Sequence, residues 1–149
     1  MARIVLDVAD AIARELNLKS FSMTFDAVRC YYPLIDIKKM SDLRVWVVPA
    51  ESSIAMDTRD SDYRDHLIHV AVQCGRCPFD DTKKLDSLVD MTDEIATYLN
   101  RMLVLQSPKT VVIESTLDKA GLWVYDHLLK FQVFTSLINV TARSWTRAN

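Results

Sequence analysis

Apolar and polar residues alternate along this chain with two different periods, and the period changes several times. Near the N-terminus, apolar residues recur at every third or fourth position from Ile4 to Leu16, with charged residues between them. This spacing is typical of an amphipathic helix and predicts one from about residue 3 to 17. The same period returns over residues 85–103 for about five turns and predicts a long second helix, with Asp80 or Asp81 as its N-cap.

The rest of the chain favours strands, because its apolar residues occupy alternate positions or short continuous runs. Before the second helix we expect an alternating strand from Phe21 that slips its phase near Ala27, and then an antiparallel meander. Asp60–Asp65 is expected to be a polar turn within this meander. The strands expected after Ala27 are Leu43–Val48, Ile54–Arg59, His66–Gln73, Thr110–Ile113, Gly121–Leu128 and Phe131–Ala142.

The last predicted strand is apolar on both sides. Val133 and Leu137 share one side, and Phe134 and Ile138 share the other. Such a strand is either central in its sheet or covered by a neighbouring subunit. The order of elements predicts an α+β fold, in which an N-terminal helix and one long amphipathic helix pack on a mostly antiparallel or mixed sheet. At 149 residues the chain is expected to be a single domain over residues 1–149, with a short polar C-terminal tail over about 143–149.

The composition of the chain excludes several classes of function. The chain has only 2 glycines, whereas phosphate-cradling loops need several residues free to adopt positive φ, so a nucleotide-loop enzyme is not expected. The net charge of −2 gives no cationic field for nucleic acid. No apolar run approaches the roughly 18–20 residues of a membrane span, and Asp7 and Asp10 interrupt the first apolar segment as no secretory signal would allow. We therefore expect no membrane partner and a cytoplasmic location in the producing cell.

Cys74 and Cys77 have the C-x-x-C spacing of a zinc half-site or a redox pair, and His66 and His69 lie just upstream. In a strand, however, residues three apart point to opposite faces, so the two histidines are not expected to share a metal. Pro78 and a helix start near residue 82 leave the thiols in a loop, away from a helix N-terminus that would activate them. Two loop thiols at a strand end is the favoured interpretation, with metal or redox chemistry as the alternative.

The remaining polar residues do not form a credible catalytic set. Asp57, Asp60, Asp62 and Asp65 lack the central Gly and distal Glu of a calcium loop. No G-x-S-x-G or H-E-x-x-H pattern occurs in the chain. We predict that the protein is not an enzyme and that it needs neither a cofactor nor a metal.

The C-terminal segment TARSWTRAN carries an aromatic ring, Trp145, between Arg143 and Arg147. Aromatic and arginine side chains are enriched where proteins meet. Trp145 is thus either an interface anchor or a ring that folds back on its own domain.

Taken together, several segments resemble the tail-terminator proteins of long-tailed bacteriophages over nearly the whole chain. They are the strand RVWVVP, a strand ending in DTR, the strand HLIHVAVQ leading into the long helix, and the closing run VYDHLLKFQVFTSLINVTAR. The resemblance implies a structural virion protein that forms a hexameric ring, caps the tail tube, stops its polymerisation and offers a docking surface to the head connector. The implied partners are other copies of the chain, the tail-tube protein and a head-completion or connector protein, with DNA only passing through the lumen. The implied location is the tail or neck of the virion, with assembly in the host cytoplasm.

A ring closes through head-to-tail contacts, so each subunit needs two different complementary patches. We expect one patch on the last strand and tail and the other near Trp46. The acidic outer face of the second helix faces outward or lines the lumen. The expected interface residues are Trp46, Tyr125, Phe131, Phe134, Arg143, Trp145 and Arg147, and the acidic face comprises Asp86, Asp90, Asp93 and Glu94.

Three alternatives to the tail terminator remain open. The first is another neck or head-completion protein, the second is an assembly chaperone that does not enter the virion, and the third is a metal-binding or redox enzyme that uses Cys74, Cys77 and a histidine.

Overall fold

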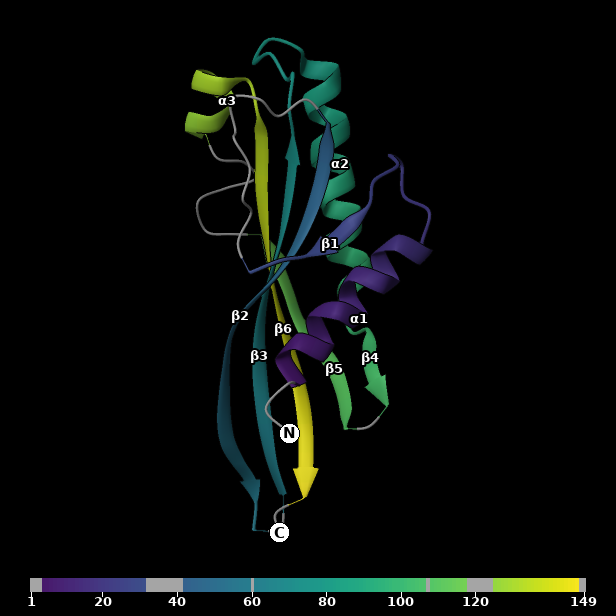
Figure 1. Ribbon diagram of the computed structural model, residues 1–149, viewed down its shortest axis with the longest axis vertical. Coiled ribbons are helices and arrows are strands. Elements are labelled where there is room, and N and C mark those ends of the chain that lie inside the picture. Colours follow the sequence, from purple (N-terminus) through teal and green to yellow (C-terminus); the bar gives the residue numbers. More distant parts are fainter. Residues whose placement is uncertain (1–3, 32–41, 60, 107, 118–124, 148–149) are drawn as a thin grey trace.

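The computed structural model describes residues 4–31, 42–59, 61–106, 108–117 and 125–147, and within these ranges it leaves out the side chains of residues 55–58, 61, 125, 146 and 147. Within these described ranges, three helices and six strands follow one another (Figure 1). In chain order they are α1 (Ile4–Leu18), β1 (Ala27–Arg29), β2 (Leu43–Thr58), β3 (Ser61–Cys74), α2 (Thr82–Leu99), β4 (Leu103–Gln106), β5 (Lys109–Leu117), α3 (Tyr125–Phe131) and β6 (Phe134–Arg147).

The strands form one sheet in the order β1-β2-β3-β6-β5-β4. β1 runs parallel to β2 and every other neighbouring pair is antiparallel, so the sheet is mixed. The predicted α+β combination of helices with a mixed sheet is confirmed. At its centre, β3 and β6 pair without a register shift from Ser61 opposite Arg147 to Cys74 opposite Phe134.

One face of this sheet carries the core. Along β3 the buried residues Ile68, Val70 and Val72 share the core face, while Leu67 and His69 on the other face are partly exposed. α1 and α2 contribute their buried faces to the same core, and α1 contacts β1, β2, β3 and β4 around the curled sheet. Each fully buried aliphatic side chain stabilises the fold by roughly 1.5–3 kcal/mol relative to exposure. The helical residues fully buried in this core include Val8, Ile12, Leu16, Leu88, Met91, Ile95 and Leu99.

β2 is longer than the sequence pattern predicts. The expected strand end at Pro49 is wrong, because β2 continues to Thr58 and a register shift between Pro49 and Glu51 accommodates the proline. The turn expected at Asp60–Asp65 is also wrong for its described part, since Ser61–Asp65 belongs to β3. Polar residues here are paired on both sides rather than looped out.

The alternating segment before β1 is not a strand up to Asp26. The Phe21 and Phe25 rings stack with centroids 5.5 Å apart, and Phe21 meets the Tyr98 ring of α2 edge-on at 5.7 Å. Its period of two thus arises from rings packed on a helix, and only Ala27–Arg29 pairs with the sheet.

Two more boundaries differ from expectation. The second helix ends at Leu99 rather than near 103, because Arg101 adopts a left-handed backbone with φ of 63° and the chain enters β4, which the sequence did not predict. The strand expected at Gly121–Leu128 is wrong where it is described: Tyr125–Phe131 is α3, while residues 121–124 lie outside the described residues.

The last strand begins at Phe134 instead of Phe131, which is the final residue of α3. The C-terminal segment expected to be a short tail is part of the sheet as far as Arg147, because residues 143–147 pair with Ser61–Asp65 of β3.

The buried face of α2 gives a direct test of this packing. We expect Ile95→Ala to lower the free energy of unfolding by about 2–5 kcal/mol, because the substitution leaves a cavity under a fully buried side chain. Urea denaturation measures the change. Thr97→Ala, at an exposed position of the same helix, is the matched control and should shift stability by about 0.5 kcal/mol or less. Equal effects of the two substitutions would contradict the packing described.

Candidate functional site

Three strands continue past the first turn of α1 and form what we call the arm: Glu51–Thr58 of β2, Ser61–Asp65 of β3 and Arg143–Arg147 of β6 (Figure 1). Two large apolar side chains are exposed there, Ile54 at 62% and Trp145 at 37%. Ile54 pairs with Arg64, whereas Trp145 pairs with Tyr63, so alternation places them on opposite faces of the arm. The arm therefore presents an apolar side chain on each face.

Arg143 holds two strands of the arm together. Its Nε and Nη2 atoms donate to the two carboxylate oxygens of Asp65 at 2.8 and 3.0 Å, and its guanidinium lies 4.1 Å from the centre of the Tyr63 ring. Both charged side chains are about one-third exposed, so water screens the pair and its contribution is about 1 kcal/mol or less. Arg143, expected at an interface, thus organises the arm within its own subunit.

Trp145 is neither on a loose tail nor folded back over the core. It sits within β6 opposite Tyr63, and the strand fixes its backbone. Trp46, the other indole expected at an interface, is half-buried in β2 and pairs with Ala71, and its buried Nε1–H has no hydrogen-bond acceptor among the described residues. Such an orphaned donor is unfavourable by about 1–3 kcal/mol.

The expected patch around Phe131, Phe134 and Trp145 does not form. Phe134 is only 1% exposed because it fills this subunit's own core, so it is not accessible to a partner. It also lies opposite Cys74, at the far end of β6 from Trp145. Phe131 ends α3 and is half-buried. Tyr125 and Arg147 belong to α3 and β6, but their side chains lie outside the described residues.

The predicted acidic face of α2 is exposed at all four positions, Asp86, Asp90, Asp93 and Glu94. Glu94 also has a structural role, since its Oε2 atom accepts hydrogen bonds from the backbone N–H and the hydroxyl of Ser22 at 3.1 and 3.0 Å. This contact ties the segment before β1 to α2.

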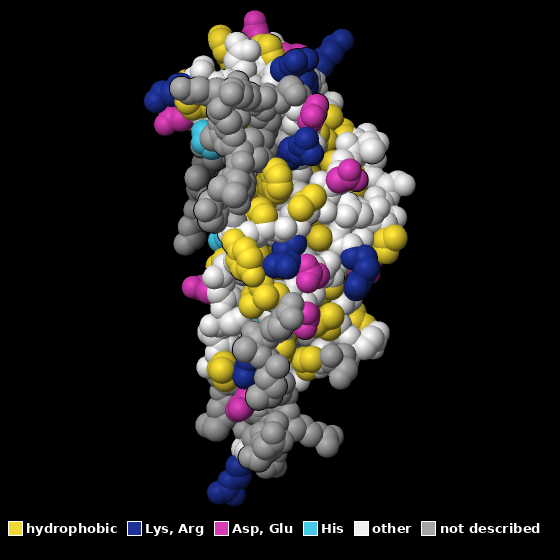
Figure 2. Space-filling model, viewed as in Figure 1, with side chains coloured by type: hydrophobic (Ala, Val, Ile, Leu, Met, Phe, Trp, Pro, Cys, Tyr) yellow, Lys and Arg dark blue, Asp and Glu magenta, His cyan; other side chains and the backbone are white. Residues whose placement is uncertain are grey.

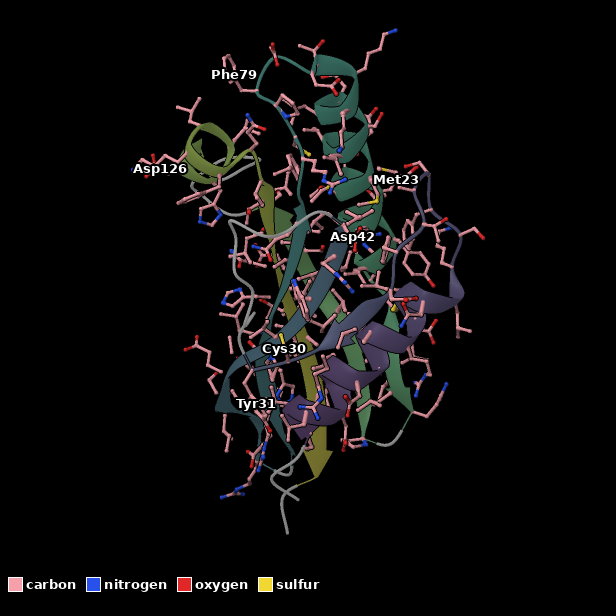
Figure 3. The ribbon with its side chains drawn as sticks, turned by 45° about the horizontal axis from the view of Figure 1, so that its top comes forward. Met23, Cys30, Tyr31, Asp42, Phe79 and Asp126 are labelled. Atoms are coloured by element: carbon pink, nitrogen blue, oxygen red, sulfur yellow. The ribbon has the colours of Figure 1, made fainter. Side chains whose placement is uncertain are left out.

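The end of the molecule opposite the arm carries an apolar groove between the start of α2 and α3. The groove has a volume of about 300 Å³, and its rim holds two exposed apolar side chains, Phe79 at 63% and Leu129 at 44%. Phe79 and Asp126 mark this end in Figure 3, and yellow apolar side chains reach the surface there in Figure 2. Its lining residues are Phe79, Thr82, Leu85, Asp86, Val89, Leu128, Leu129 and Phe134. The sequence pattern did not indicate this groove, because the start of α3 lies in the segment Gly121–Leu128 that was expected to be a strand.

At the root of the arm, a chain of hydrogen bonds crosses four strands. Ser52 Oγ lies 2.7 Å from His66 Nδ1, and His66 Nε2 lies 3.2 Å from Ser144 Oγ. Ser144 Oγ in turn lies 2.7 Å from Thr110 Oγ1, which donates to the carbonyl oxygen of Pro108 at 3.0 Å. His66, Thr110 and Ser144 are buried on the core face.

The direction of donation along these hydrogen bonds follows from the last group in the series, the Pro108 carbonyl. The Pro108 carbonyl only accepts, so Thr110 donates to it and accepts from Ser144, which in turn accepts from His66 Nε2–H. When His66 is neutral, its Nδ1 accepts the Ser52 hydroxyl proton, so the neutral form is the Nε2–H tautomer. Burial lowers the pKa of His66, and the neighbouring Arg64 lowers it further.

A cavity of about 450 Å³ adjoins Ser52 and His66, between the first turn of α1 and β2. A hydroxyl that donates to a neutral imidazole resembles the first step of nucleophile activation. In this series of hydrogen bonds, however, the second nitrogen of the imidazole, Nε2, is linked to two further hydroxyls. This arrangement satisfies buried polar groups across the sheet. The sequence pattern could not predict this series of hydrogen bonds, because it depends on the register between strands whose residues are up to 78 positions apart.

The histidines do not share a site with the cysteines. His66 points to the core face, whereas His69 Nδ1 lies 2.7 Å from Asn139 Oδ1 on the other face, as strand alternation predicted. Within the described part of the chain, no three His, Cys, Asp or Glu side chains gather as metal ligands. Of the acidic cluster, Asp65 is paired with Arg143, while Asp60 and the Asp57 side chain lie outside the described residues.

Cys74 ends β3 and Cys77 follows in a tight loop, and both are buried. Both Sγ atoms lie within hydrogen-bond distance of the carbonyl oxygen of Gly75, at 3.5 and 3.6 Å. The loop is fixed from two sides, since the backbone N–H of Cys77 donates to the Gln132 carbonyl at 2.7 Å and Lys84 Nζ donates to the Arg76 carbonyl at 2.8 Å. Cys77 lies in a loop at the end of β3, as predicted, whereas Cys74 belongs to β3 itself, where it pairs with Leu43 and Phe134.

No helix among those described has both the length and the apolar composition needed to cross a bilayer. Neither the protein-family models nor the curated sequences compared with the chain gave a match.

The neutral His66 predicts a pH dependence of stability. Because its pKa is lower in the folded protein than the ordinary value of 6.5, protons bind first to the unfolded chain. The full stability is present above about pH 6.5 and is lost as the pH falls towards the folded pKa, by at most about 1.4 kcal/mol per pH unit. Urea denaturation between pH 7.5 and 5 measures this loss.

The matched variants are His66→Gln and His69→Gln. His66→Gln should lower stability at neutral pH, because it disrupts the buried hydrogen-bond chain, and it should flatten the decline below about pH 6.5. His69→Gln should keep the decline. An unchanged acid slope in His66→Gln would refute the assignment.

Proposed function

We propose that this chain is a structural subunit of the neck or tail terminus of a long-tailed bacteriophage. In this role it assembles into a ring, expected to be a hexamer, on the end of the tail tube. The ring stops tube growth and offers its other side to the head connector. The proposal starts from the resemblance of the strand and helix segments to tail terminators.

The observation that carries the proposal is the arm. Strands that extend past the helices gain little stability from burial in the core. The exposed Trp145 and Ile54 on opposite faces of the arm are therefore poorly explained by the fold of one subunit. Tryptophan is also among the residues that contribute most to protein interfaces. The arm is therefore the surface that we assign to contact with another protein.

The distribution of other exposed apolar residues supports more than one interface. Phe79 and Leu129 lie at the groove, at the end of the molecule opposite the arm. Val28 and Leu103 are exposed on β1 and β4, the two edge strands of the sheet. A closed ring needs two different lateral patches, and a ring between a tube and a connector needs two different ends. We assign the edges to lateral contacts, and the arm and groove to the two ends.

The acidic face of α2 suits passage of DNA if it lines the lumen. Exposed carboxylates at Asp86, Asp90 and Asp93 would repel phosphates and prevent the duplex from adhering. On an outward-facing α2 the same residues would serve solubility alone.

We expect the purified protein to form rings on tail tubes of the phage that encodes it, and the variant Ile54→Ser with Trp145→Ser to bind those tubes at least tenfold more weakly. The reason is that a buried interface anchor contributes on the order of 2 kcal/mol. Negative-stain electron microscopy counts capped tubes, and light scattering reports the ring mass.

The matched control is Leu18→Ser, which removes a 73% exposed apolar side chain at the end of α1, away from the arm. It should cap tubes as well as the unmodified protein. Equal capping by the arm variant would exclude the arm as an interface. Absence of rings both in solution and on tubes would contradict the proposed function, and absence of the protein from purified virions would favour an assembly chaperone.

A further inference from the structure

The proposed ring does not assign any role to the C-x-x-C loop. Cys74 and Cys77 are separated only by Gly75 and Arg76, and Arg76 adopts a left-handed backbone with φ of 55°. That conformation folds the loop back, so both thiols reach the same carbonyl oxygen of Gly75 at 3.5 and 3.6 Å. Both sulfur atoms thus lie within 3.6 Å of one oxygen atom and are close enough for a hydrogen bond between the two side chains. The loop that carries them is itself held to α2 and to the segment before β6.

The surroundings of the two thiols favour a negative charge on one of them. Lys84 Nζ lies 3.4 Å from the Gly75 carbonyl oxygen and 2.8 Å from that of Arg76, so a positive charge is placed beside the loop. The hydrogen bond from the Cys74 thiol and, to a smaller extent, the charge of Lys84 together lower the pKa of Cys77 to about 7, against the effect of burial. The same hydrogen bond raises the pKa of Cys74. Cys77 is therefore the nucleophile and Cys74 keeps its proton.

We propose that Cys74 and Cys77 form a dithiol that hydrogen peroxide oxidises to an intramolecular disulfide. In the first step the Cys77 thiolate attacks one peroxide oxygen, the O–O bond breaks, and hydroxide leaves as a sulfenic acid forms on Cys77. In the second step Cys74 Sγ attacks Cys77 Sγ, the S–O bond breaks, and the sulfenic oxygen leaves as water with the Cys74 proton. The protein loses two electrons and two protons, and one peroxide becomes two waters.

Burial determines which oxidant suits this pair. Cys74 is 4% exposed and Cys77 is fully buried, so a bulky disulfide reagent has no room to form a mixed disulfide there. Peroxide is about the size of water. Cys30, the third cysteine, is more accessible, but burial raises its pKa, and it lies after β1, near Tyr31 (Figure 3), with no cysteine beside it in sequence. It serves as the internal reference thiol.

Peptide mapping of the whole protein tests the inference without a mutation. Trypsin cleaves after Arg64, Arg76 and Lys83, so the two cysteines fall on separate peptides, residues 65–76 and 77–83. After treatment of the native protein with peroxide, we expect these peptides to be joined, with a mass lower by two hydrogen atoms than their sum. A reducing agent should separate them. Cys30 should react on the order of tenfold more slowly, because less of it is thiolate.

Two single variants identify the roles. In Cys74→Ser, oxidation should stop at the sulfenic acid of Cys77, seen as a gain of one oxygen atom and trapped by dimedone. In Cys77→Ser, Cys74 should stay a free thiol over the same time. The inference would be overturned if peroxide left residues 65–76 and 77–83 as separate reduced peptides, or if it joined Cys74 or Cys77 to Cys30 instead. None of these outcomes depends on ring formation, so this inference and the proposed function stand or fall separately.

Discussion

The uninterrupted pairing of β3 with β6 is the constraint on which the rest of the structure depends. Because side chains alternate along a strand, a single register over both strands puts Ile68, Val70, Ile138 and Val140 on one face. α1 and α2 find their buried partners only on that face. A slip of one residue would turn the apolar set away from both helices. The same pairing also extends past the helices and forms part of the arm.

The core changes character where the helix layer stops. Towards α2 it is aliphatic, but at the root of the arm the core-face positions are held by His66, Ser144 and Thr110. These three side chains are buried, and the one-directional hydrogen-bond chain satisfies their polar atoms. The chain links β2, β3, β6 and β5 where aliphatic packing ends. It therefore couples the arm to the body of the subunit.

The two ends of the molecule are held together by different contacts. At the arm, Arg143 and Asp65 fix the strands and leave Trp145 and Ile54 facing outward. At the other end, Lys84 and the backbone around Gln132 hold the C-x-x-C loop under the apolar groove. Oxidation of that loop would stiffen the junction of β3, α2 and β6, which also supports Phe134 in the wall of the groove.

The local sequence pattern was sufficient to predict features that depend on residues close together in the sequence, or on one period that repeats over many residues. α1 and the face alternation of His66 and His69 followed from spacing, since helix and strand geometry act residue by residue. Tertiary structure decided the rest. Pro49 stays in β2 because a bulge absorbs it, Tyr125–Phe131 is helical although its apolar run suits a strand, and Phe21 alternates with Phe25 to pack on Tyr98. Phe134 is core rather than interface, and Trp145 is held in a strand rather than a tail, because β6 pairs with β3 along its full length, and such pairing joins residues too far apart for any local pattern to specify.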